Sequence, residues 1–261
     1  MPLLLNRLLA PALLVLPLLM LPLLAPAGTA RAQGLNAQRF SAAQRQEIIA
    51  IVRDALRRDP TLLRDALAAL ETEEQQGREG QVRAAIAARA AALFRDAADP
   101  VRGNPAGAIT LVEFFDARCP YCKRMIPALN ELVRRNPDVR VVLKDMPILG
   151  ANSTLASRAL LAAQRQGKYH EYHDAVLSLR EEPTEPVLQR EAEQLGLNWI
   201  TMLRDMADPA VQRRLDATLA LARELGVEGT PAFIIGDRLV PGAVDLAGLE
   251  ALVAAARAPV R

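Results

Sequence analysis

The strongest constraint on the fold is a strand–helix–strand pattern between residues 109 and 143. Residues 109–115, ITLVEFF, combine β-branched and aromatic side chains in the way typical of a buried strand. A helical stretch follows from about residue 119 to residue 135, and residues 139–143, VRVVL, predict a second strand. Because a helix connects these strands, the crossover should be right-handed and the strands parallel. The sequence therefore predicts an α/β fold.

The remainder of the main domain is predicted to be helical before it returns to the sheet. Residues 151–225 show helical periodicity and form an all-helical insertion. Residues 231–240 contain the run PAFII and a Gly-Asp turn, which predict a β-hairpin, and residues 246–256 close the chain as a helix. A loop at residues 99–107, rich in glycine, asparagine and proline, marks the start of this domain, which we place at residues 101–261.

An N-terminal helical arm, residues 33–100, precedes the main domain. Ser41 and Gln44 fit a capping box, and Asp59-Pro60 fits the start of a second helix. Residues 71–81 are polar and contain two glycines, which predicts a hinge or bend. The arm is too small to bury its apolar stripes by itself. It either packs on the main domain or joins copies of the chain, and the sequence leaves both open.

The first 32 residues have the features of a signal peptide. Arg7 precedes an apolar run from residue 8 to about residue 24, and Ala30-Arg31-Ala32 fits a cleavage site. A transmembrane anchor is the alternative, but four prolines interrupt the segment. Export would place the protein in an oxidising compartment, where disulfides persist.

Composition narrows the classes of function. The chain is 51% hydrophobic with a net charge of +2, which argues against disorder. It has no basic stripe, so we expect no nucleic-acid partner. The only two cysteines lie three residues apart, which excludes a disulfide-stapled scaffold and a four-thiolate metal site.

Those cysteines form Cys119-Pro120-Tyr121-Cys122, directly after a predicted strand and at the start of a helix. Free N–H groups and the helix dipole should lower the pKa of Cys119 and make it the attacking nucleophile. Cys122 lies deeper in the helix and should be the resolving thiol. An inert disulfide is the first alternative, although so short a loop stabilises little. A metal site with His170 and His173 is the second, but their spacing is unusual for zinc, and we expect no metal.

Glu113 and the bond between Thr230 and Pro231 are two further candidate features of the site. Glu113 lies within an apolar strand on the same face as Leu111 and Phe115, so its pKa should be raised and it could relay a proton for Cys122. The alternative is a glutamate at a strand end that reaches water. A cis bond between Thr230 and Pro231 would leave backbone groups of Thr230 free to pair with an extended substrate, whereas a trans bond would make an ordinary turn.

With these features placed, the chain resembles the DsbA-like branch of the thioredoxin superfamily. The resemblance is carried by FFD before the Cys-Pro-Tyr-Cys motif, by KDMPILG at residues 144–150 and by GTPAF at residues 229–233. Residues 41–75 are similar to the N-terminal extension of ScsC-like proteins, which are copper-tolerance relatives of DsbA. Cys-Pro-Tyr-Cys also occurs in glutaredoxins, but these lack the helical insertion.

The resemblance implies a thioredoxin fold and a role for each site residue. It assigns Cys119 as nucleophile, Cys122 as resolving thiol and Glu113 as buried acid, with the substrate surface at Thr230, Pro231, Pro120 and Tyr121. The redox-active disulfide of the two cysteines would be the only cofactor.

The same resemblance implies a periplasmic disulfide isomerase or reductase, which self-associates through residues 41–75 and is often a trimer. Its partners would be unfolded or misoxidised client proteins and a membrane redox protein. The alternatives are a DsbA-like oxidase that introduces disulfides, or a protein that uses the same thiols to bind Cu(I).

Overall fold

The computed structural model describes residues 40–257, so the predicted signal segment lies outside the described residues. The chain divides into two compact units, of which the first ends at Asp65 and the second begins at Ala66. The boundary falls within a long helix, α2 (Thr61–Ala88). The second unit thus starts well before residue 101, where the sequence placed the thioredoxin-like domain, because the end of α2 and the short α3 (Ala90–Phe94) pack against its sheet.

The second unit is built on a five-stranded sheet with the order β1-β3-β2-β4-β5. As predicted, β2 (Ile109–Phe115) and β3 (Val139–Asp145) are parallel and are connected by α4 (Pro120–Arg135). The predicted hairpin is also confirmed, since β4 (Ala232–Ile235) and β5 (Arg238–Pro241) are antiparallel neighbours. This arrangement confirms the thioredoxin-type fold.

The structure corrects the prediction of a plain loop at residues 99–107. Val101–Gly103 forms the edge strand β1, antiparallel to β3. A three-residue strand is too short to show an alternating pattern, and its last residue is a glycine. Gly103 has a φ of 83°, and a Cβ atom there would lie 2.8 Å from the Val139 carbonyl oxygen. Glycine is thus required where β1 leaves the sheet.

Helices cover both faces of the sheet. Side chains of α4, of α6 (Tyr169–Ser178) and of α10 (Leu246–Arg257) form one core with β2, β3 and β4. On the other face, α2, α3 and α9 (Pro209–Glu224) pack against Val112, Phe114 and Val142. The site described below faces the first of these two cores.

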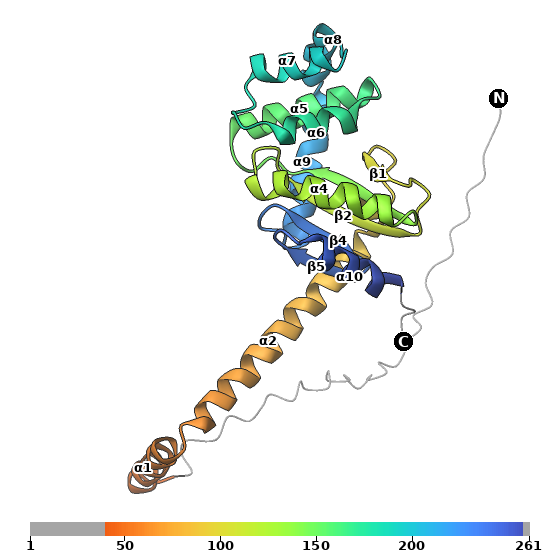
Figure 1. The fold of residues 1–261 in the computed structure, drawn as a ribbon. Helices are drawn as coiled ribbons and strands as arrows, with labels where there is room; N and C mark the ends of the chain where they lie inside the picture. The colour runs from red at the N-terminus through yellow and green to blue at the C-terminus, as the bar shows by residue number, and fades with distance from the viewer. Residues whose placement is uncertain (1–39, 258–261) are drawn as a thin grey trace, which may run out of the picture. The chain divides into compact units, whose positions relative to one another are not determined.

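The predicted helical insertion is present as five helices. Besides α6 and α9, they are α5 (Ala151–Arg165), α7 (Glu185–Gln194) and α8 (Trp199–Met206). Figure 1 shows α5 to α8 grouped together beyond the sheet. Trp199 and Tyr172 are buried in their packing, as expected for core residues. No helix among residues 40–257 is long and apolar enough to cross a membrane.

The expected hinge at residues 71–81 is wrong, because α2 runs through this segment without a break. Each glycine costs about 1 kcal/mol relative to alanine in a helix, but the residues around them are strong helix formers. Gln75 donates to Glu79 over 2.8 Å and Arg78 pairs with Glu74 one turn away. Burial of Ile86 further along anchors the helix at its end. These contributions outweigh the two glycines.

The first unit contains α1 (Ala42–Arg58), which begins with the predicted capping box. The Gln44 N–H donates to the Ser41 hydroxyl over 3.2 Å, and the Ser41 N–H donates to the Gln44 side chain over 2.8 Å. No residue of α1 is buried. Its large apolar side chains are therefore exposed, namely Ile48, Ile49, Ile51, Val52 and Leu56. An exposed apolar helix face of this kind is typical of an interaction surface.

Candidate active site

Cys119 is the N-cap of α4, and Pro120 occupies the first position of the helix. Proline is favourable there because its missing N–H group has no partner in the first turn. The Cys119 side chain is 4% exposed and Cys122, one turn along, is fully buried. Both residues are free thiols. The chain thus places one nearly buried thiol at the helix start and a second, buried thiol beneath it.

Three kinds of hydrogen bond favour the thiolate of Cys119. The Cys122 thiol is the largest influence, followed by the Thr230 side chain and the N–H groups of Cys122 and Tyr121, and together they lower the pKa of Cys119 to about 5 although burial opposes this. The backbone donors at the helix start confirm the sequence argument. The contribution of the Cys122 thiol was not foreseen, because it depends on side-chain direction within the first turn.

The same contact acts in the opposite sense on Cys122. Its pKa is raised far above the ordinary value, first because its proton is shared with Cys119, then because it is buried, with the charges of Glu113 and Cys119 adding to the effect. Cys119 is therefore ready to attack at neutral pH, whereas Cys122 needs a base to remove its proton.

Glu113 lies near the end of β2, between Leu143 on β3 and Phe233 on β4. It is 1% exposed, and neither carboxyl oxygen has a hydrogen-bond partner among the described residues. Burial raises its pKa to about 8, with the Arg102 charge opposing and the Cys119 charge adding to the increase. The alternative of a glutamate that reaches water is thus excluded. A buried carboxyl group with this pKa can take or give a proton near neutral pH.

The bond between Thr230 and Pro231 is cis. It brings Thr230 next to the active-site helix, where the Cys119 thiol donates to the Thr230 carbonyl oxygen over 3.1 Å. Beside this loop is a cavity of about 400 Å³ lined by residues 226–232, Leu239, Pro241 and Gly242. The structure thus brings the predicted substrate loop into contact with the predicted nucleophile.

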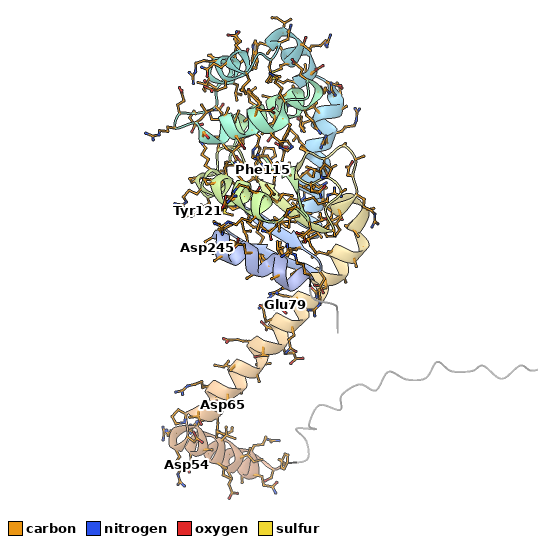
Figure 2. The ribbon with its side chains drawn as sticks, turned by 45° about the vertical axis from the view of Figure 1, so that its right-hand side comes forward. Asp54, Asp65, Glu79, Phe115, Tyr121 and Asp245 are labelled. Carbon is orange, nitrogen blue, oxygen red and sulfur yellow. The ribbon has the colours of Figure 1, made fainter. Side chains whose placement is uncertain are left out.

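Tyr121 and Pro120 are exposed at the start of α4. The Tyr121 ring is stacked by the Arg124 guanidinium, 4.3 Å from the ring centroid. Figure 2 shows Tyr121 at the surface and Phe115 inside the unit. An exposed aromatic side chain beside a reactive thiol can contact a second molecule.

Asp116 is the residue of this site that the sequence argument missed. It is fully buried between β2 and α4. Its carboxylate accepts hydrogen bonds from the N–H groups of Arg118 and Ile148 (both 2.8 Å) and Leu149 (3.0 Å), and from the Ser153 hydroxyl (2.8 Å). It therefore ties the loop before Cys119 to the loop that leads into α5. An acidic residue at the end of an apolar strand, just before the cysteines, was the available signal.

The two histidines do not join the thiols in a metal site. His173 is buried, with its ring 4.8 Å from that of Phe115, and His170 contacts the Val101 carbonyl oxygen over 2.8 Å. Within residues 40–257, no three or more histidine, cysteine, aspartate or glutamate side chains are placed to hold a metal ion. Both histidines pack within the fold.

A parallel β-α-β unit, a hairpin preceded by a cis proline and a Cys-x-x-Cys motif at a helix start together define a thioredoxin-type protein. Residues 110–254 match the family model of the DSBA-like thioredoxin domain, and residues 44–76 match that of the copper resistance protein ScsC N-terminal domain. The chain belongs to the DsbA-like thioredoxin family and carries an ScsC N-terminal domain.

Solved structures agree with this assignment. A thioredoxin-like oxidoreductase from Silicibacter pomeroyi is 43% identical over 64% of this chain and 96% of that chain, with a TM-score of 0.63. Proteus mirabilis ScsC in a transitional conformation is 33% identical over 84% of this chain and 97% of that chain, with a TM-score of 0.62. A periplasmic thioredoxin-like protein from Salmonella enterica serovar Typhimurium is 37% identical over 64% of this chain and 94% of that chain, with a TM-score of 0.60.

Curated relatives are much longer proteins. The Na(+)/H(+) antiporter NhaA 3 of Salinispora tropica is 33% identical over 165 residues, which is 62% of this chain and 25% of that protein. The chain spans about a quarter of the length of the curated relatives that it matches.

Proposed function

We propose that this DsbA/ScsC-type thiol–disulfide oxidoreductase acts on other proteins as a disulfide isomerase or reductase, with Cys119 and Cys122 as its reacting groups. The observation that carries the proposal is the opposite perturbation of the two thiols. At neutral pH one is held as a thiolate and the other as a thiol. A pair of this kind attacks a disulfide with one sulfur and resolves the product with the other.

In the proposed reaction the Cys119 thiolate attacks one sulfur of a client disulfide. A mixed disulfide forms, and the other client sulfur leaves as a thiolate. Glu113, in its ionised form, then takes the proton of Cys122, and the Cys122 thiolate attacks the Cys119 sulfur. The Cys119–Cys122 disulfide forms, the bond to the client breaks, and the client has gained two electrons. In isomerisation another client thiolate releases Cys119 before this last step, so no net electron transfer occurs.

Thr230, Pro231, Pro120 and Tyr121 form the proposed client surface. Once Cys119 is ionised it no longer donates to the Thr230 carbonyl oxygen, which can then accept a hydrogen bond from an extended client segment. The exposed Tyr121 ring offers apolar contact area at the same edge. The clients are unfolded or misoxidised proteins, and the Cys119–Cys122 disulfide is the only cofactor required.

Self-association through residues 41–75 completes the proposal. The exposed apolar face of α1 and the half-exposed Leu63, Leu67 and Leu70 of α2 supply the surface. We propose a homo-oligomer, with a trimer as its form, so that several Cys119 sites can act on one client. In this arrangement residues 41–75 form the oligomerisation surface, and residues 101–261, against which the end of α2 and α3 pack, form the catalytic domain.

The proposed location is the periplasm, with residues 1–32 as a cleavable signal. The basic residue, the apolar run and the small-residue cleavage site follow one another in this segment and support export. The similar Salmonella protein is periplasmic. A membrane redox protein would then supply the electrons that keep Cys119 and Cys122 reduced.

The decisive experiment compares two assays on the full mature chain. We expect reactivation of scrambled ribonuclease that depends on Cys119, and slower oxidation of reduced ribonuclease. Activity in the oxidation assay alone would show a DsbA-like oxidase instead. Retention of in-cell function by Cys119→Ala would contradict thiol exchange.

A further inference from the structure

Arg102 is a buried arginine that the proposed reaction does not yet use. It lies on β1, and its side chain is 9% exposed. The guanidinium donates to Asp174 of α6 (3.0 Å to Oδ2), to His173 Nδ1 (3.2 Å) and to the Asn130 side chain of α4. An arginine is always charged, and burial of its charge is expensive unless it is paired. The cluster therefore fixes a positive charge inside the fold.

The strand register places this charge on the same side of the sheet as Glu113. Arg102 lies directly opposite Val141 on β3, and Val141 is the neighbour of Leu111 on β2. Leu111 and Glu113 are two residues apart on β2, so their side chains share a face. β3 separates β1 from β2, so the two backbones are about 10 Å apart, and a long arginine side chain covers much of that span. Both side chains also lie against the core formed with α4 and α6.

We propose that Arg102 is a positioning residue for Glu113, whose buried charge, held in place by Asp174 and Asn130, stabilises the carboxylate that accepts the Cys122 proton. This inference rests on the proposed thiol-exchange function and extends it to the supply of the base. It gives Arg102 a role in the second half of the reaction only, because Cys119 attacks the client before Glu113 is needed.

Other charges on this side of the sheet do not replace Arg102. Its titratable and charged groups include Arg102 from β1, Asp145 from β3, the thiols of α4, and Tyr169, His170, His173 and Asp174 from α6. Burial lowers the pKa of His173 to about 4, so this ring is neutral at working pH. Burial raises the pKa of Glu113, and the Arg102 charge opposes this increase. Arg214 of α9 also acts on Asp145 and Tyr169, but it is paired with Asp99 over 3.2 Å and does not act on Glu113 in the same way. The remaining groups are anionic or neutral.

The test isolates the step in which Cys122 resolves a mixed disulfide. Full-length protein is converted to a mixed disulfide between Cys119 and an aromatic thiol, and release of that thiol is followed over a pH series. Cys122 loses its proton to Glu113 and attacks the Cys119 sulfur, and the aromatic thiolate leaves, so atoms and electrons balance. For the unaltered chain we expect the release rate to rise with a midpoint below pH 8, because the Cys119 charge that helps to raise the pKa of Glu113 to about 8 is absent from the mixed disulfide.

Two variants should shift the midpoint in opposite directions, and two further variants serve as controls. In Arg102→Gln the midpoint should rise by about one pH unit, as expected for the loss of a charge at this range in a protein interior. In Asp174→Asn the midpoint should fall, because the arginine loses its partly exposed counter-ion. Arg102→Lys keeps the charge and should restore the midpoint. Arg140→Gln is the matched control, since Arg140 lies opposite Gly103, the residue next to Arg102, but is one residue from Val141 and so faces the other side of the sheet.

The outcomes separate this inference from the function on which it rests. An unchanged midpoint in Arg102→Gln, or movement of Arg102→Gln and Asp174→Asn in the same direction, would overturn the role of Arg102 while thiol exchange stands. If Arg102→Gln does not fold, an unchanged midpoint in Asp174→Asn would overturn it equally. Failure of the unaltered chain to release the aromatic thiol would instead refute the proposed function.

Discussion

The substitution Cys122→Ala removes the hydrogen bond from Cys122 to Cys119, and the structure gives the size of the resulting change in the pKa of Cys119. The pKa of Cys119 falls from 9.0 to about 5, through the Cys122 thiol, the Thr230 side chain and two backbone N–H groups, against the opposing effect of burial. These four contributions together exceed about four pH units, so the largest of them must exceed about one unit, or about 1.4 kcal/mol. We therefore expect the pKa of Cys119 to rise above about 6 in Cys122→Ala.

The assay is the rate of alkylation of Cys119 over a pH series, with the ultraviolet absorbance of the thiolate as a second measure. Cys122→Ser is the matched variant, because its hydroxyl keeps a donor at nearly the same place and should give a smaller rise. An unaltered midpoint in Cys122→Ala would refute the reasoning, since the backbone donors would then account for the whole effect.

Three further substitutions test the other parts of the proposal. Glu113→Gln should leave the stability of the protein unchanged near pH 4 and increase it at higher pH. The pKa of Glu113 is raised in the folded state, so the unaltered protein loses stability as the pH rises from 4.5 to about 8. Urea unfolding above that range should show a gain of up to about 5 kcal/mol in the variant. Asp116→Ala should lower the free energy of unfolding by about 2–4 kcal/mol, because buried N–H groups lose their acceptor. Asp116→Asn should recover part of this loss. Equal stability of the unaltered chain and both variants in urea unfolding would contradict the argument. Ile48→Glu combined with Val52→Glu should prevent the proposed self-association without altering alkylation of Cys119. Light scattering that shows the same oligomer for this variant and the unaltered chain would exclude the α1 face as its interface.

Local patterns in the sequence were sufficient for most of the main domain. The run ITLVEFF predicted β2 with its observed bounds, because a buried strand needs a continuous apolar segment and strand alternation then fixes which side chains share a face. The same alternation correctly predicted that Glu113 is buried beside Phe115. The position of Cys119 at a helix start followed from the proline after it and from the strand before it.

The features that could not be predicted depend on contacts between distant segments. β1 is a strand only because β3 supplies its hydrogen-bond partners, and three residues carry too little pattern of their own. The continuity of α2 depends on a balance between two glycines and the packing of Ile86 far along the helix. Asp116 gains its importance from N–H groups more than thirty residues away, which no local pattern contains.

One contact sets the order of reaction at the two thiols. A proton that lies between two sulfurs stabilises the negative charge on the acceptor and resists removal from the donor, so the same hydrogen bond lowers the pKa of Cys119 and raises that of Cys122. Once Cys119 enters a mixed disulfide it no longer carries this charge, and that part of the barrier to ionising Cys122 disappears. Burial of Cys122 remains, however, and solvent does not reach it. In the proposed mechanism the proton then goes to a group inside the fold. Glu113, whose charge acts on Cys122, has a pKa raised by burial, so its ionised form can accept that proton near neutral pH.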